Sequence, residues 1–262
     1  MSYFLLTLKH RNEVLFYYGL VCLAFALACL VATKTTQTQL YGVNAWYKPF
    51  KFAFSTFLLV WAIAWYVYHL PHFNTRLFSW SMVVLLGFEI GYIALQASKG
   101  QPSHYNNSTP LYALLFSLMA LAATLATLYI AYVGLLFMWY DFPALPNHYV
   151  WAIRLGIWIF VVFAFEGFLM GGQMSHTVGL QNDNSSLWIV GWSRRAGDLR
   201  IAHFVGMHAI QCLPLLSYYV LKNTKLTLAA GLLYALLATF TLVQALQGRP
   251  LLPERQSTQQ PL

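Results

Sequence analysis

The sequence predicts an all-α fold, a polytopic membrane protein that forms a single bundle of seven transmembrane helices. Composition is the first observation: 59% of the 262 residues are hydrophobic and only 8% are charged, too few to cover a water-facing surface. Aromatic residues make up 17% of the chain, and amphipathic rings concentrate at bilayer interfaces. The apolar residues also gather into stretches of about 20, the length that crosses a bilayer. The lipid bilayer is therefore the predicted environment.

Seven stretches satisfy this length, taken in chain order. The predicted spans are Val14–Thr33, Phe50–Leu70, Leu77–Gln96, Leu111–Trp139, Val150–Gly172, Leu199–Leu221 and Leu226–Gln247. The fourth is too long for an upright helix, which predicts tilt or an interfacial extension. The first follows Lys9 and Arg11, as a cleavable signal would, but its length favours an uncleaved helix. We expect one transmembrane domain over residues 1–248 and a polar, disordered tail over residues 249–262.

The connections differ between the two membrane surfaces. One surface carries short, turn-rich links, and the other carries three longer loops: Lys34–Pro49, Ser98–Pro110 and Gln173–Asp198. Lys and Arg weakly place the long loops inside, but several of these cations would equally suit a binding site, so orientation stays open. The net charge of +8 does not indicate nucleic acid, because the cations stand singly between apolar runs.

Glu89 and Glu166 are the acidic residues predicted to lie far from a helix end. An ionised side chain near mid-bilayer costs about 2.5–3.5 kcal/mol on insertion scales, so both should face the bundle interior and have partners. At about 1.5 Å of rise per residue, Glu89, Glu166 and His203 all fall roughly 7–12 Å below the long-loop rim. A shared depth is what a single site requires.

The sixth span supplies the candidate partners. Arg200, His203 and Met207 follow one helical stripe, while His208 lies about 140° round from His203, with Gln211 between them. A broad polar face results.

Three further features place this polar face in the bundle. Asp198 should be the N-cap of the sixth span, and Pro214 should kink it. The second span carries a polar stripe of Lys48, Lys51 and Ser55. The loop residues His104 and His176 should lie at the mouth of the site.

Two carboxylates with several imidazoles form a ligand set suited to a divalent metal, Zn or Fe. Such a cation would offset the burial of both Glu side chains. The spacing matches no known metal motif, since His203 and His208 are five residues apart. The predicted ligands are Glu89, Glu166, His203, His208, His104 and His176.

Other classes of protein fit the same residues. A b-type haem or quinone redox protein would use His203 or His208 as an axial ligand of the haem. Arg200 or Lys51 would then bind a propionate. A proton-coupled small-molecule transporter or a membrane sensor would use the Glu and His side chains without a cofactor.

A purely structural role is the remaining alternative. Glu89 would pair with Arg200 and Glu166 with Lys51, and these ion pairs would only hold the bundle together.

Three segments, Asn44–Lys51, Gly100–Asn106 and Gly197–His208, resemble those of an uncharacterised family of bacterial multi-pass membrane proteins. The resemblance spans most of the chain. It implies a bacterial origin and the inner (cytoplasmic) membrane, and it supplies no activity.

The leading hypothesis is a membrane-embedded, metal-dependent enzyme that acts on a lipid or lipid-like substrate. Glu89 and Glu166 would be its catalytic residues. Lys51, Arg200 and Gln211 would bind the substrate head group or a cofactor. The reaction type, and whether the chain is an enzyme at all, stay open, and nothing indicates an oligomeric state.

Overall fold

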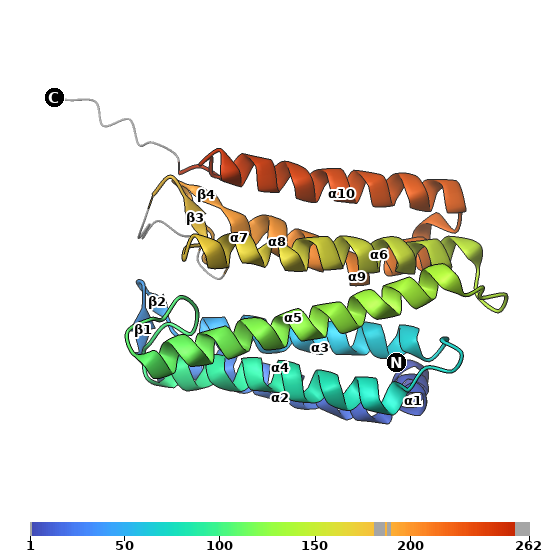
Figure 1. The fold of residues 1–262 in the computed structure, drawn as a ribbon, viewed down its shortest axis with the longest axis horizontal. Coiled ribbons are helices and arrows are strands. Elements are labelled where there is room, and N and C mark those ends of the chain that lie inside the picture. The colour runs from blue at the N-terminus through green and yellow to red at the C-terminus, as the bar shows by residue number, and fades with distance from the viewer. Residues whose placement is uncertain (1, 181–186, 188–189, 255–262) are drawn as a thin grey trace.

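The computed structural model describes residues 2–180, 187 and 190–254. These residues form an all-α bundle, as predicted, in which 6 helices are long and apolar enough to cross a membrane and one bent helix pair makes up to 7. Figure 1 shows the helices side by side along the long axis of the molecule. The single-span helices are α2 (Glu13–Thr35), α3 (Tyr47–Val67), α4 (Thr75–Ser98), α5 (Pro110–Trp139) and α10 (Thr224–Leu246).

The two remaining spans are interrupted. The fifth consists of α6 (Asn147–Phe165) and α7 (Gly167–Gly172), and the sixth of α8 (Leu199–Met207), α9 (Ala209–Leu216) and the π-helical η1 (Ser217–Leu221). Short antiparallel pairs lie in the long loops, one formed by β1 (Gln39–Leu40) and β2 (Val43–Asn44), the other by β3 (Thr177–Val178) and β4 (Gly197–Asp198). The seven predicted spans therefore match these elements.

Side-chain caps explain where four of the membrane helices begin. Each cap oxygen accepts a hydrogen bond from the amide three residues later, which satisfies a donor that the first helical turn leaves free. The capping residues are Asn12, Asn74, Thr109 and Asn223. Pro110 follows Thr109 in the first turn of α5, where a missing N–H costs nothing. α5, at 30 residues, is longer than the hydrocarbon core requires, and Figure 1 shows it slanting across its neighbours.

The apolar core fills the end of the bundle that carries the short links. Large, fully buried side chains from five of the spans meet there: Leu15, Ile63, Phe78, Met82, Phe137, Ile153 and Ile157. The predicted polar residues lie toward the opposite, long-loop end, where β1–β4 and the C-terminal end of α10 are found (Figure 1). Polar chemistry and tight apolar packing thus occupy different depths of the same bundle.

The sixth span bends by 44° at His208, between α8 and α9. Pro214, predicted to kink this span, lies inside α9 and has no N–H to offer the carbonyl of Ile210. The hydroxyl of Tyr66 donates to that carbonyl at 2.8 Å, and Tyr66 is buried in α3. A side chain of the second span therefore replaces the helical hydrogen bond that the proline removes.

Replacing Tyr66 by Phe is expected to lower the free energy of unfolding by about 1–3 kcal/mol, because the Ile210 carbonyl then stays buried without a donor. Unfolding by SDS in mixed micelles measures the difference. Tyr132→Phe is the matched control, since Tyr132 is 49% exposed on α5. Equal stability of the two variants would contradict this role for the hydroxyl.

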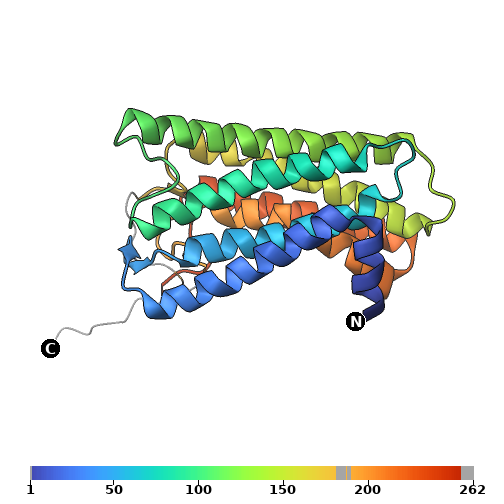
Figure 2. The same cartoon turned by 90° about the horizontal axis from the view of Figure 1, so that it is seen from below.

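Helix α1 (Ser2–Arg11) turns away from the direction of α2 at the short-link end (Figure 2). The Arg11 guanidinium lies 3.8 Å from the centre of the Trp65 ring, and its Nη1 is 3.2 Å from Nε2 of His69. Arginine can only donate, so the His69 nitrogen accepts and the imidazole is neutral. Burial, with Arg11 beside it, lowers the pKa of His69 to about 4.

This histidine makes the stability depend on pH in a defined direction. Between about pH 6.5 and pH 4 the unfolded chain binds a proton at His69 and the folded chain does not, so the free energy of unfolding falls as the pH falls through this window. Thermal unfolding followed by Trp fluorescence at pH 7.5 and pH 5 should show a smaller loss for His69→Gln than for the original protein. The exposed His72 gives the control variant His72→Gln. A pH response identical in all three proteins would refute the assignment.

Part of the predicted tail lies against the protein. Gln244 donates to the carbonyl of Pro250 at 2.9 Å, and Glu254 pairs with Arg195 at 2.7 Å. Residues 255–262 lie outside the described part of the chain.

Candidate functional site

Glu166 and His203 form a buried pair between the fifth and sixth spans. Glu166 occupies the interruption between α6 and α7 and is only 6% exposed. One of its carboxylate oxygens lies 3.3 Å from Nδ1 of His203 on α8. Within the described residues neither oxygen has a hydrogen-bond donor, so this carboxyl group is buried with His203 as its ionic partner.

The backbone orients the imidazole of this pair. Nδ1 of His203 is 2.7 Å from the carbonyl oxygen of Phe163, and a carbonyl only accepts, so Nδ1 carries the hydrogen. In a neutral ring Nε2 is then the unprotonated nitrogen. A Cβ on Gly167 would lie 3.3 Å from Cε1 of His203, so the glycine that opens α7 makes room for the ring. The helix interruption thus supplies both the carboxyl group and the space for its partner.

A second contact joins α3 to the loop after α4. Nζ of Lys48 lies 2.9 Å from Nδ1 of His104, and the hydroxyl of Ser103 lies 3.1 Å from the same nitrogen. Burial, followed by the nearby Lys48 charge, lowers the pKa of His104 well below its usual range, so the ring is neutral and accepts from the lysine. Glu89, half-buried on α4, lies within electrostatic reach of both Lys48 and His203.

Arg200 is held by Asp198, the predicted and observed N-cap of α8. Nε of Arg200 donates to one carboxylate oxygen at 2.9 Å and Nη2 to the other at 2.6 Å. The amide of Ser193 also donates to Asp198, at 2.8 Å. The carboxylate is 1% exposed and fully hydrogen-bonded, as a buried charge requires.

Two cations of the site bind backbone carbonyls of the loop before α8. Nη2 of Arg200 donates to Gly191, and Nζ of Lys51 donates to Val190 at 2.9 Å. The expected ion pair of Glu166 with Lys51 is wrong for the described residues, because the carboxylate pairs with an imidazole instead.

The other expected ion pair, between Glu89 and Arg200, is also wrong within the described residues. Arg200 pairs with Asp198. The purely structural hypothesis therefore loses both of the contacts on which it depended.

His176 lies on the loop between α7 and β3. Its carbonyl accepts from the amide of Leu199 at 3.0 Å, next to the start of α8. Burial, with the nearby charge of Arg200, lowers the pKa of its imidazole to about 4. His104 and His176 lie within electrostatic reach of one another, so both predicted mouth residues lie at this end of the bundle.

His208 and Gln211 lie deeper and elsewhere on the sixth span. The ring of His208 packs edge-on against Phe204, 4.4 Å between centroids, and Gln211 interacts with His208. Gln211 is about 16 Å along the span from Arg200 at 1.5 Å per residue. One small head group would not contact both, so Gln211 belongs with His208 and not with Lys51 and Arg200.

Among the described residues, no three His, Cys, Asp or Glu side chains lie together in a group that could hold a metal ion. Zn or Fe and haem b stay predictions. Sequence reasoning did not find the Phe163 carbonyl, because a backbone acceptor freed by a helix break has no residue type of its own. It placed Lys48 in the polar stripe of the second span but did not count it among the site residues.

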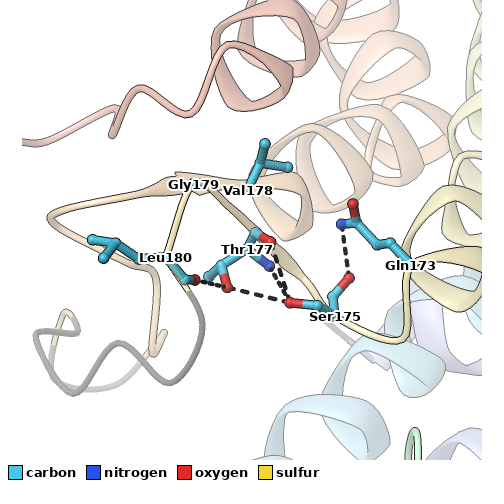
Figure 3. A pocket seen from close by; sticks show the side chains of 6 residues that line it. All are labelled: Gln173, Ser175, Thr177, Val178, Gly179 and Leu180. Atoms are coloured by element: carbon cyan, nitrogen blue, oxygen red, sulfur yellow. Dashed lines mark hydrogen bonds between the residues drawn. The ribbon is translucent and has the colours of Figure 1, made fainter.

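A shallow hollow on the long-loop surface differs from the Glu166–His203 site in how its polar groups are bonded (Figure 3). Its polar groups bind one another: the side chain of Gln173 donates to the carbonyl of Ser175 at 2.9 Å, and the amide of Thr177 donates to the Ser175 hydroxyl at 3.1 Å. We assign it to the structure of the loop. The lining residues are Gln173, Ser175, Thr177, Val178, Gly179 and Leu180.

In comparisons with protein-family models, curated proteins and solved structures, nothing matches this chain.

Proposed function

We propose that this protein is a proton-coupled transporter of a small molecule, and that Glu166 and His203 exchange the coupling proton. The observation that carries the proposal is the buried Glu166 carboxyl group, which has no hydrogen-bond donor in the described structure and faces Nδ1 of His203 at 3.3 Å. Ionisable groups inside a membrane are costly, and a functional role is the default interpretation.

The pair can hold its mobile proton in two places. With the proton on Glu166 both side chains are neutral, and with the proton on Nε2 of His203 they form an ion pair. Because Nδ1 already carries a hydrogen, the proton passes between Glu166 and Nε2 through a water molecule or the solute, and Nε2 releases it there. Neither state leaves a single uncompensated charge, so the exchange avoids the desolvation cost of a lone buried ion. Nε2 of His203 is the nitrogen left to meet a solute or a water molecule, because Nδ1 faces Phe163 and Glu166.

The interrupted helices support transport over a rigid binding role. Glu166 stands at a one-residue turn in the fifth span, which runs over Asn147–Gly172, and His203 lies on α8, just before the bend of 44° in the sixth. Broken membrane helices such as the sixth span are typical of transporter binding sites, where freed backbone groups meet polar solutes and segments can move. The apolar core lies between this site and the short-link surface, so a transporter in this conformation would be closed on that side.

A metal-dependent enzyme acting on a lipid-like substrate is the second candidate. A histidine that ligates a metal commonly directs its other ring nitrogen at a carboxylate or a carbonyl, and His203 has both. In that case Nε2 of His203 would be the ligand and Glu166 would orient it. Lys48 and His104 would lie at the substrate end of the site.

On the resemblance of its motifs, we further propose that the protein belongs to an uncharacterised family of bacterial multi-pass proteins of the cytoplasmic membrane.

The test uses purified protein reconstituted in liposomes that enclose a pH-sensitive dye. Under an imposed pH gradient, cationic, neutral and anionic small solutes are added in turn. We expect at least one solute class to drive proton movement above that of protein-free liposomes. Metal content is measured on the same preparation. Stoichiometric metal, lost on His203→Ala, with no solute-driven proton movement would replace the transporter by the enzyme.

A further inference from the structure

Three cations gather where α3 and α8 begin at the long-loop end of the bundle. Lys48 and Lys51 lie in the first turns of α3, and Arg200 lies in the first turn of α8. All three lie within electrostatic reach of one another. We call Lys48, Lys51 and Arg200 the cation cluster.

The described carboxylates balance the charge of this cluster only in part. Asp198 pairs with Arg200, and Glu89 lies within electrostatic reach of Lys48, so two carboxylates face three cations. Within the described residues no carboxylate lies within 4.0 Å of either lysine, whose hydrogen-bond partners are the neutral His104 ring and the carbonyl of Val190. Like charges at this spacing repel, and buried or half-buried charges are ordinarily paired. Among the described residues, the cluster therefore keeps a net positive charge that a bound anion would neutralise.

Hydrogen-bond donors are also left over at this place. A lysine ammonium carries three donors, and Lys48 and Lys51 each make one hydrogen bond to the described protein. Nη1 of Arg200 is not engaged by Asp198, which takes Nε and Nη2. A Cβ built on Gly191 would lie 3.8 Å from both Nη1 of Arg200 and Nζ of Lys51, so the absence of a side chain at Gly191 keeps these groups uncovered.

The backbone adds to the same polarity. The first turns of α3 and α8 direct the positive ends of two helix dipoles toward this rim. Cations and positive helix ends at one rim form a binding environment for anions.

We propose that the cation cluster binds a phosphate or carboxylate group, and that the solute of the proposed transporter is therefore a small anion. The part of this inference that makes the anion the transported solute rests on the proposed function. The binding site itself rests only on the three cations and on the net positive charge that they keep among the described residues. The same group can arrive on a free anion or on the head group of an anionic lipid, and the experiment separates these sources.

Binding is measured on the full-length protein in detergent and in nanodiscs. Inorganic phosphate and succinate are titrated by calorimetry, and native mass spectrometry counts phosphatidylglycerol retained from nanodiscs that contain it. Lys48→Gln and Lys51→Gln each remove one charge of the cluster, and Lys51→Arg keeps it. Lys99→Gln removes an exposed charge at the same rim and is the matched control.

We expect the original protein, Lys51→Arg and Lys99→Gln to bind alike, and each Gln variant of the cluster to bind at least tenfold more weakly, or about 1.4 kcal/mol. A response to phosphate or succinate identifies a free anion, and retained phosphatidylglycerol alone identifies a lipid head group. Equal binding by all variants, or no binding of any probe, overturns the proposal. A monodisperse elution profile shows that each variant is folded.

This test does not depend on proton coupling. Anions that bind to Glu166→Gln protein as they do to the original protein would support the cluster even if the transporter proposal failed. Conversely, proton movement driven only by cationic or neutral solutes would support the transporter proposal and contradict the proposal that its solute is an anion.

Discussion

Replacing Glu166 by Gln is expected to abolish solute-driven proton movement, lowering its initial rate by about a hundredfold or more, the range of a lost acid–base group. The amide has nearly the shape of the carboxyl group, but it can neither release a proton nor carry the negative charge that faces the protonated His203 at 3.3 Å. Two measurements check this. Proteoliposomes give the rate, and infrared difference spectra between acidic and alkaline pH give the carboxyl band that the substitution should remove.

The control is Glu13→Gln, since Glu13 lies exposed in the first turn of α2 and pairs with Lys9 at 4.0 Å. It should leave the rate unchanged and keep the carboxyl band that Glu166→Gln removes. His203→Gln should also stop proton movement, because the pair then has one member. If Glu166→Gln retained coupling while His203→Gln lost it, the proton would be exchanged elsewhere, and Glu89 would be the next residue to test, since it lies within reach of His203.

Replacing Gly206 by Ala is expected to have the largest effect on stability. The new Cβ would lie 2.1 Å from Cγ of Phe163, a ring that is 4% exposed between α6 and α8. Overpacking of this kind costs about 1–3 kcal/mol, and here the ring has little space to retreat. Moving Phe163 also moves the carbonyl that orients His203, so proton movement should fall together with stability. SDS unfolding and the liposome assay measure the two effects.

Gly91→Ala is the matched control, because nothing lies within 4 Å of a Cβ at this exposed position of α4. A helical glycine of this kind is expected to gain about 0.5–1 kcal/mol on substitution. The double variant Gly206→Ala with Phe163→Ala removes the clashing ring. It should be no less stable than Phe163→Ala alone. A full loss for Gly206→Ala in both backgrounds would show that the clash is not the cause.

The spans could be predicted from the sequence because a run of about 20 apolar residues has one stable outcome in a bilayer. Asp198 as a cap was predictable for a similar local reason. The partners of the charged side chains were not. Whether Glu166 meets Lys51 or His203 depends on the rotation of whole helices and on the break after Phe165, which no pattern of residues announced.

The sequence could group the polar residues by their level along the spans, but not by the partner that each side chain meets. His203 and His208 both lie on the sixth span, but the bend at His208 separates the ring that meets Glu166 from the ring that packs on Phe204. Hydrogen bonds from side chains to backbone carbonyls could not be predicted from the sequence for another reason. Lys51 binds the carbonyl of Val190, and any residue type would offer that acceptor.

In the proposed transporter, the apolar packing between the Glu166–His203 pair and the short-link surface would have a kinetic consequence. A solute that arrives among the polar groups meets a floor of interlocked side chains, including Ile63, Phe78 and Ile153, each 0% exposed. For the solute to pass, these close-packed side chains must separate, and that conformational change is slow and depends steeply on temperature. Proton transfer is fast by comparison. The bottleneck of each cycle would then be mechanical, and small-to-large substitutions in the floor would change its speed without touching the residues that recognise the cargo.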